Sequence, residues 1–331
     1  MLAEPLTVFN TSLAPVFFMV KVKPFIIGTR NSGEFLYAGA EILREGGSAI
    51  DAVEASTKLV EENPKDDSVG YGGVPNLLGK VELDASIMDG RTLKTGAVGA
   101  VKGYPHVISI ARMVMEKTPH VMLVGSGAEL FAEAMGFKKQ NLLTKNAKAA
   151  YQSFLKKYAD SPIEGEKPWY VNYDVDFGLR DWYDKLTDKQ HGTVNIMAID
   201  KRRDICSGVS TSGTAFKFPG RLGDSPIIGA GNYCDNRFGA AACTGRGELS
   251  IRLSTARTIV CYMENGMTVR EACFRGMKDI NELHDKGTMN CLVMDNKGNT
   301  MSASTSRESV HWYMDIESKE PELRNGIYVK E

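Results

Sequence analysis

The sequence predicts an α+β fold in which helices pack on sheets that are largely antiparallel. Segments with strand-like and helix-like patterns are mixed in both halves of the 331-residue chain, without the strict alternation that a doubly wound parallel sheet requires. After residue 193 the strands come in pairs joined by short polar turns, as in β-hairpins. Apolar residues make up 43% of the chain, which is enough for the core of one large domain or two small ones.

The N-terminal half opens with a short apolar strand, and helical segments punctuated by glycine and proline follow it. Ser48 is the expected N-cap of the second helix, with Asp51 as its capping partner three residues on. Residues 120–130 have the pattern of a strand, a turn at GSG and a helix. The predicted segments are a strand at 25–28, helices at 34–44 and 49–62, a strand at 81–90, a helix at 106–116, the strand and helix of 120–130, and a helix at 146–158.

The C-terminal half is expected to begin with a hairpin and to end with another. Its first strand starts at Thr193, directly after a polar connector that covers about 159–192. A loop of this length inside a compact domain is usually functional or mobile. The predicted segments are strands at 193–200 and 205–213, helices at 248–264 and 268–284, and a second hairpin at 291–304.

The first 24 residues are expected to form an N-terminal extension. Their apolar run, 13–20, is far shorter than the 18 or so residues that span a membrane. No basic residue precedes the run and no clear cleavage site follows it, so a cytoplasmic protein is expected, with a degenerate signal peptide as the alternative. Residues 25–192 and 193–331 would then be the two halves of one domain.

Composition argues against several classes of function. The 40 basic and 41 acidic side chains nearly cancel, whereas a nucleic-acid or anionic-membrane binder needs a basic excess. The six cysteines form no CxxC pair and are expected to be reduced thiols, and the five histidines form no HExxH motif. No metal and no cofactor are therefore expected. A nucleotide site at GSG (125–127) is kept only as an alternative, because Leu130 replaces the third glycine of GxGxxG.

Gly192-Thr193 is the arrangement in this sequence that suits covalent catalysis. No GxSxG elbow, P-loop or kinase motif is present. If the bond between these two residues is cut, Thr193 carries both a nucleophilic hydroxyl and a free α-amine. The amine has a reference pKa of about 7.7 to 8.0, so a fraction of it is neutral and can accept the hydroxyl proton. Gly-Thr at the start of a strand is common in β proteins, so the flanking motifs decide its meaning.

Those flanking motifs resemble a known family. STSG (210–213), GRLGDSPIIGAG (220–231) and ACTGRGE (242–248) resemble the β-subunit motifs of the glycosylasparaginases, which are asparaginase-type N-terminal nucleophile hydrolases. DDSVGYGG (66–73), VELDASIMDG (81–90), the run 96–125 and GF-KK-NLL (136–143) resemble their α-subunit. The similarity covers nearly everything from Phe25 to about Met301 except the connector.

The resemblance implies a fold, an assembly and a reaction. The fold would be a four-layer αββα sandwich, and the chain would cleave itself before Thr193 to give a homodimer of processed αβ units. Thr193 would attack the side-chain amide of asparagine or N4-substituted asparagine, and the acyl-enzyme would be hydrolysed to aspartate. Thr211 would orient the nucleophile, and the hydroxyl of Thr244 with the backbone N–H of Gly245 would form the oxyanion hole, whose donors are worth roughly 3 to 4 kcal/mol each.

The resemblance also implies the amino-acid pocket. Arg221 would bind the α-carboxylate of a small-molecule substrate through its planar fork, and Asp224 would pair with the α-ammonium. Two opposite charges three residues apart suit such a zwitterion in their own right. The residues expected to line the pocket are Arg221, Leu222, Gly223, Asp224, Thr244, Gly245, Arg246 and Gly247. The alternatives are that Thr211 only fills a strand position, that Arg221 and Asp224 form a surface ion pair worth under about 1 kcal/mol, and that 244–247 is a plain turn.

Two departures from the family pattern bear on activity. Gly192 stands where the family usually has aspartate before the nucleophile, although the related plant-type asparaginases also cleave at Gly-Thr. Arg30 stands where the glycosylasparaginases typically carry tryptophan at the substrate pocket. A cation in place of an indole makes free L-asparagine, a β-aspartyl peptide or an acidic leaving group credible alternatives. A further alternative is an unprocessed, non-catalytic member of the family.

Overall fold

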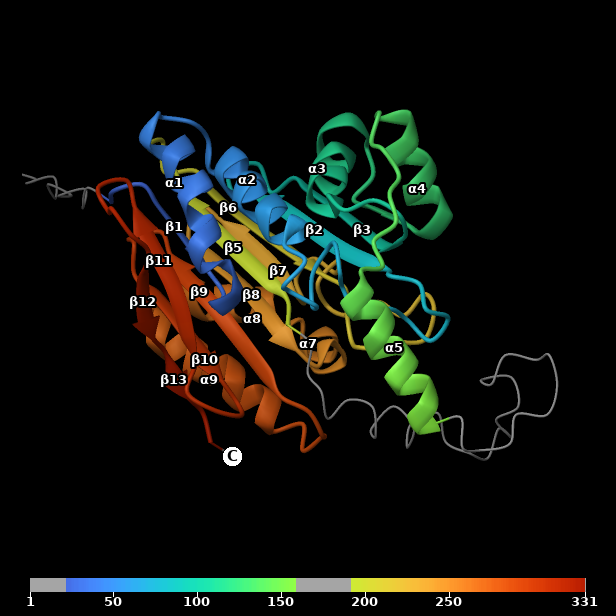
Figure 1. Ribbon diagram of the computed structural model, residues 1–331. Helices are drawn as coiled ribbons and strands as arrows, with labels where there is room; N and C mark the ends of the chain where they lie inside the picture. The colour runs from blue at the N-terminus through green and yellow to red at the C-terminus, as the bar shows by residue number, and fades with distance from the viewer. Residues whose placement is uncertain (1–21, 159–191, 331) are drawn as a thin grey trace, which may run out of the picture.

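The computed structural model describes residues 22–158 and 192–330 (Figure 1). Most of the predicted N-terminal extension, residues 1–21, and the connector at 159–191 lie outside the described residues. The predicted division into an extension and two halves of one domain therefore stays a prediction.

A large mixed sheet carries the start of both halves of the chain. Its strand order is β12-β11-β1-β5-β6-β2-β3-β4, and all neighbours are antiparallel except β3 and β4. The strand that follows Thr193, β5, thus lies in the middle of the sheet between β1 and β6. The strands are β1 (Phe25–Gly28), β2 (Leu83–Asp89), β3 (Thr95–Val101), β4 (Met122–Val124), β5 (Val194–Ile199), β6 (Ile205–Thr211), β11 (Val310–Asp315) and β12 (Glu322–Asn325).

A smaller sheet is built from the C-terminal half alone. Its order is β13-β10-β9-β8-β7, with β13 parallel to β10 and the other pairs antiparallel. The strands are β7 (Asn232–Asp235), β8 (Gly239–Gly245), β9 (Met289–Asp295), β10 (Thr300–Ser304) and β13 (Ile327–Tyr328). The helices are η1, a 3-10 helix (Arg30–Phe35), α1 (Leu36–Arg44), α2 (Ala49–Glu62), α3 (Val107–Lys117), α4 (Gly125–Ala134), α5 (Lys145–Tyr158), α7 (Gly247–Leu253), α8 (Thr255–Glu264) and α9 (Val269–Asn281).

Three apolar clusters hold these elements together. One lies between the large sheet and helices α1 to α4, and a second lies between the small sheet and helices α7 to α9. The third joins the two sheets, with Met197 and Val209 of the large sheet packed with Ala242 and Leu292 of the small one. Figure 1 shows the helices on the outer faces of the two sheets. The predicted α+β class is confirmed.

Local signals in the sequence account for the starts of helices α2 and α9. The Ser48 hydroxyl accepts a hydrogen bond from the backbone N–H of Asp51 at 3.2 Å, as predicted, and Thr268 and Glu271 form a complete capping box at the start of α9. The predicted helix at 34–44 begins later, because residues 30–35 form the 3-10 helix η1.

The prediction of one helix over 248–264 is wrong. Ser254 adopts the left-handed conformation, with φ 49° and ψ 48°, and separates α7 from α8. The break lets the backbone N–H groups of Ala256 and Arg257 donate to the carbonyls of Ala230 and Gly229, at 3.1 and 2.8 Å, instead of continuing α7. These bonds tie α8 to the loop that follows the predicted pocket residues 221–224 and fix the position of that loop.

Candidate active site

Thr193 lies at the entrance to β5, and its hydroxyl faces Thr211. The pairing of Val194 with Ser210 places the next two residues, Thr193 and Thr211, opposite each other on adjacent strands. Their Oγ1 atoms are 3.2 Å apart, and Thr193 is only 8% exposed. The β-sheet register therefore brings together the expected nucleophile and the residue expected to orient it. The alternative that Thr211 only fills a strand position is disfavoured by this contact.

The Thr211 hydroxyl is fully used in hydrogen bonding. It donates to the carbonyl of Gly192 at 3.3 Å and accepts from the backbone N–H of Gly213 at 3.0 Å. A hydroxyl has one donor and two acceptor sites, so its remaining contact must be acceptance from the Thr193 hydroxyl. The proton of Thr193 thus points at Thr211, and the proton of Thr211 points at the carbonyl of the predicted cleavage site.

Thr244 and Gly245 end strand β8 at the same place. The side-chain amide of Asn195 donates to Thr244 Oγ1 at 2.7 Å and to the carbonyl of Cys243 at 3.2 Å. Gly245 has φ 142°, and a Cβ there would lie 2.2 Å from the carbonyl oxygen of Thr288, so only glycine fits. Residues 244 and 245 are therefore the end of a strand rather than the plain turn of the alternative interpretation.

The loop that carries Arg221 and Asp224 packs against the first turn of α7. The Arg221 guanidinium bonds the carboxylate of Glu248 through two nitrogens, at 2.8 to 3.0 Å. A Cβ at Gly247 would lie 2.5 Å from the backbone nitrogen of Asp224, so glycine permits this approach. Asp224 is 4% exposed, which excludes the interpretation of a surface ion pair between Arg221 and Asp224.

The electrostatic environment of Asp224 is unusual for a carboxyl group. Burial raises its pKa to about 7, against the lowering effect of the Arg221 charge, and Glu248 adds to the increase. Its Oδ2 atom is buried and accepts no hydrogen bond from the described residues. A buried acceptor without a partner is costly, and a bound cation would satisfy it.

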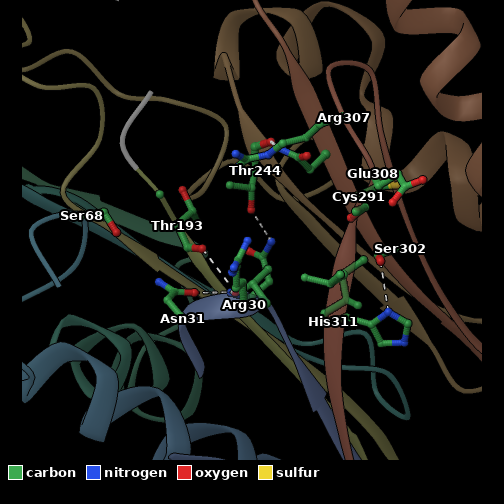
Figure 2. A pocket seen from close by; sticks show the side chains of 17 residues that line it. Arg30, Asn31, Ser68, Thr193, Thr244, Cys291, Ser302, Arg307, Glu308 and His311 are labelled. Atoms are coloured by element: carbon green, nitrogen blue, oxygen red, sulfur yellow. Dashed lines mark hydrogen bonds between the residues drawn. The ribbon is translucent and has the colours of Figure 1, made fainter. Parts of the chain in front are cut away.

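A cavity of about 280 Å³ opens beside Thr193 (Figure 2). Of the predicted site residues, Arg30, Gly192, Thr193 and Thr244 line it. Thr211 contacts Thr193 but is not in the lining, and neither are the residues at 221–224 and 245–247. The full lining consists of Thr29, Arg30, Asn31, Ser68, Gly192, Thr193, Asn195, Thr244, Asn290, Cys291, Leu292, Ser302, Arg307, Glu308, Ser309, Val310 and His311.

Sequence reasoning missed Asn195. It lies two residues after Thr193, so it occupies the same face of β5 and also lines the cavity. It is fully buried, and its backbone N–H donates to the Thr29 hydroxyl at 3.0 Å. The signal for it was present, because a polar residue two positions from the nucleophile in an otherwise apolar strand needs a partner.

A polar chain from the N-terminal half was also missed. The Thr29 hydroxyl bonds the Asn31 side chain at 2.9 Å, and Asn31 donates to Asp66 at 2.7 Å. Asp66 in turn accepts from the Ser68 hydroxyl at 2.5 Å. A Cβ at Gly192 would lie 2.9 Å from Ser68 Oγ, so this chain approaches the predicted cleavage site closely. The pattern DDSVGYGG drew attention to this segment, but only the fold shows what it contacts.

Two features of the described residues bear on metal chemistry and on membrane insertion. Within residues 22–158 and 192–330, no cluster of three or more histidine, cysteine or acidic side chains is arranged to hold a metal ion. Over the same part of the chain, no helix is long and apolar enough to cross a membrane. All six cysteines are free thiols, and five of them are buried.

Comparison with known proteins identifies relatives over most of the chain. Residues 29–322 match the asparaginase family. The chain is 42% identical over 261 residues to the N(4)-(beta-N-acetylglucosaminyl)-L-asparaginase of Elizabethkingia miricola, which covers 78% of this chain and 69% of that protein. It is 38% identical over 277 residues to the isoaspartyl peptidase/L-asparaginase of Mus musculus, and the aligned region covers 83% of this chain and 77% of that protein. It is 37% identical over 289 residues to the plant-type L-asparaginase of Pyrococcus horikoshii, and the aligned region covers 87% of this chain and 90% of that protein.

Proposed function

This chain belongs to the asparaginase family and is an enzyme that acts on the side-chain amide of asparagine, and we propose a nucleophile for it. That nucleophile is Thr193, once the chain has cleaved itself between Gly192 and Thr193. The substrate is asparagine or an N4-substituted asparagine, and the products are aspartate and an amine or ammonia. The observation that carries the proposal is the buried contact of 3.2 Å between the hydroxyls of Thr193 and Thr211, beside a cavity that Thr244 also lines.

Self-cleavage uses the contacts around Gly192. Thr193 Oγ attacks the Gly192 carbonyl carbon, and the hydroxyl proton moves to the departing backbone nitrogen as the C–N bond breaks. Water then hydrolyses the resulting ester, which leaves Thr193 with a free α-amine. The Thr211 hydroxyl, 3.3 Å from the Gly192 carbonyl oxygen, would stabilise the negative charge that develops on that oxygen.

Amide hydrolysis repeats the same chemistry on the substrate. The neutral α-amine of Thr193 accepts the hydroxyl proton, Oγ attacks the side-chain carbonyl carbon, and the proton passes to the leaving nitrogen. Thr244 Oγ1 already accepts from Asn195 at 2.7 Å, so its own hydroxyl proton is available to the developing oxyanion together with the Gly245 N–H. Water completes the cycle by hydrolysing the acyl-enzyme to aspartate.

Recognition of the amino-acid head group falls to the loop at 221–224. The buried, unsatisfied Oδ2 of Asp224 supports a role in binding the substrate ammonium. Arg221 would exchange part of its pairing with Glu248, which is 39% exposed, for the substrate carboxylate. The backbone of Leu222 and Gly223, and of Gly245 to Gly247, would complete this side of the site.

The finer architecture belongs to the same proposal. We propose the four-layer αββα sandwich of the N-terminal nucleophile hydrolases, supported by the apolar cluster between the two sheets and by helix layers on their outer faces. We propose that the active form is a homodimer of processed αβ units.

The proposal is tested by Thr193→Ala and Thr193→Ser variants with L-asparagine as substrate. We expect aspartate and ammonia from the wild type, reduced but measurable release from Thr193→Ser, and an uncleaved, inactive Thr193→Ala chain. Hydrolysis by Thr193→Ala would refute the assignment of the nucleophile. A wild-type chain that stays intact and inactive on asparagine and N4-substituted asparagines would instead favour the non-catalytic alternative.

A further inference from the structure

Two asparagine side chains, Asn195 and Asn290, line the catalytic cavity, and both bond to the end of strand β8. Asn195 donates to the hydroxyl of Thr244 at 2.7 Å and to the carbonyl of Cys243 at 3.2 Å. Asn290 lies opposite Thr244 in the register of β9 with β8, and it donates to the Thr244 carbonyl at 3.1 Å. The residue expected to supply the oxyanion donor is therefore bonded by two carboxamides.

These hydrogen bonds fix the orientation of each carboxamide. A side-chain amide has an NH2 group with two donors and a carbonyl oxygen that only accepts. Turning either amide over would place its oxygen against a backbone carbonyl oxygen, that of Cys243 for Asn195 and that of Thr244 for Asn290. Two acceptors cannot share a hydrogen bond. The amide nitrogens therefore face β8, and the amide oxygens are left for other partners.

Neither amide oxygen has a hydrogen-bond partner in the part of the chain that the structure describes. Oδ1 of Asn195 is buried without a bond, and the residue as a whole is 0% exposed, so bulk water does not satisfy it. A buried acceptor left unpaired costs about 1 to 3 kcal/mol. Oδ1 of Asn290 likewise accepts no bond from the described residues, although Asn290 is partly exposed. The cavity thus offers two acceptors next to the oxyanion donor.

From this arrangement we propose that Asn195 and Asn290 accept hydrogen bonds from the departing nitrogen of the substrate, and that they favour amides with an N–H group over esters. The inference rests on the proposed function, in which Thr193 attacks the side-chain carbonyl and Thr244 binds its oxygen. Figure 2 shows Thr193 and Thr244 at the same end of the cavity. The departing nitrogen is bonded to the same carbon as the oxyanion, so it arrives beside the two carboxamides that bond to Thr244.

The two acceptors act on the step in which the amide bond breaks. In the tetrahedral intermediate, the nitrogen takes the proton that the α-amine of Thr193 received from the hydroxyl, and it becomes positively charged. The C–N bond then breaks with its electron pair on nitrogen, so the amine leaves neutral and the acyl group stays on Thr193. Because hydrogen bonds from a charged N–H group are roughly twice as strong as neutral ones, the acceptors stabilise the transition state more than the bound substrate. The oxygen of an ester starts without a hydrogen to donate, so it does not gain this stabilisation.

The test compares L-asparagine with the β-methyl ester of L-aspartate, which gives the same acyl-enzyme. The kcat/KM of each compound is measured with processed enzyme, and the ratio of amide to ester is compared between variants. In Asn195→Ala we expect kcat/KM to fall about tenfold for asparagine and about twofold for the ester, which lowers the ratio about fivefold, or by about 1 kcal/mol. Asn290→Ala should lower the ratio about threefold, and the double variant should lower it more than either single change.

Two control variants separate this effect from a general loss of activity. Thr244→Ala removes the oxyanion donor that both substrates use, so kcat/KM should fall by the same factor for both and the ratio should not change. Asn265→Ala removes an exposed carboxamide at the end of α8 and should leave the ratio at its wild-type value. Hydrolysis of the ester also shows that each variant is folded, processed and able to form the acyl-enzyme.

The outcomes distinguish failure of this inference from failure of the proposed function. If Asn195→Ala and Asn290→Ala slow the amide and the ester by equal factors, the two carboxamides do not bind the departing nitrogen, and the inference alone is overturned. An equal fall of the ratio in Asn265→Ala also overturns it. A wild type that hydrolyses neither these two compounds nor N4-substituted asparagines overturns both the proposed function and this inference.

Discussion

Replacing Thr211 with valine tests whether this hydroxyl assists self-cleavage. Valine has the same shape but lacks the hydroxyl that donates to the Gly192 carbonyl and accepts from Thr193 and from the Gly213 N–H. A hydrogen bond to a group that becomes charged contributes about 1.5 to 3 kcal/mol. Its loss in the transition state should slow cleavage by about 10- to 150-fold. Gly213 is partly exposed, so its unpaired N–H can bond water and the free energy of unfolding should fall by only about 1 kcal/mol.

The assay follows the disappearance of the full-length chain by denaturing gel electrophoresis and intact mass after purification of the precursor. Thr211→Ser keeps the hydroxyl and is the matched control, which should process within a few-fold of the wild-type rate. A correctly folded Thr211→Val chain that cleaves as fast as the wild type would refute the argument, because the hydroxyl contact would then contribute nothing.

Three further substitutions test other contacts. Asn195→Ala removes the donor that directs the Thr244 hydroxyl, so kcat for L-asparagine should fall about tenfold with little change in KM; a change confined to KM would contradict this role. Burial raises the pKa of Glu61 to about 8, so the folded state favours the protonated form and the free energy of unfolding falls as pH rises from about 4.5 to 8. Glu61→Gln should weaken the dependence of the melting temperature on pH in this range. An unchanged dependence would exclude Glu61 as its source. Lys217→Met leaves the buried Asp84 carboxylate, 3.0 Å from the lysine in the wild type, without its ionic partner. The free energy of unfolding measured with denaturant should fall by about 3 to 5 kcal/mol. Adding Asp84→Asn to the same chain should recover part of that stability, and no recovery would argue against the ion pair as the cause of the loss.

The sequence predicted the elements whose local signals are strong. The Ser48 cap, the glycine and proline breaks and the hairpin at 291–304 all reflect interactions within a few residues, and the structure confirms them. Strands β3 and β8 were not predicted. Both are buried on two faces and consist largely of alanine, glycine and valine, so they lack the alternation of polar and apolar residues that marks a strand.

The site shows the same division between local and long-range information. The motifs around Thr193, Thr211 and Thr244 could be recognised along the chain, and the register of β5 with β6 explains why the first two meet. The partners from distant segments could not be predicted, because Arg307, Thr29 and Ser68 come to line the cavity beside Thr193 only through tertiary packing. The break at Ser254 likewise depends on carbonyl groups of a loop more than twenty residues earlier.

The most direct test of the account is the identity of the chains in the purified enzyme. Intact mass and N-terminal sequencing of the wild type should show two chains, the second beginning Thr193-Val194-Asn195. That result would place the free α-amine and the nucleophilic hydroxyl on one residue, as the mechanism requires. Amidase activity from a single uncut chain, or from chains cut at another bond, would contradict the central claim.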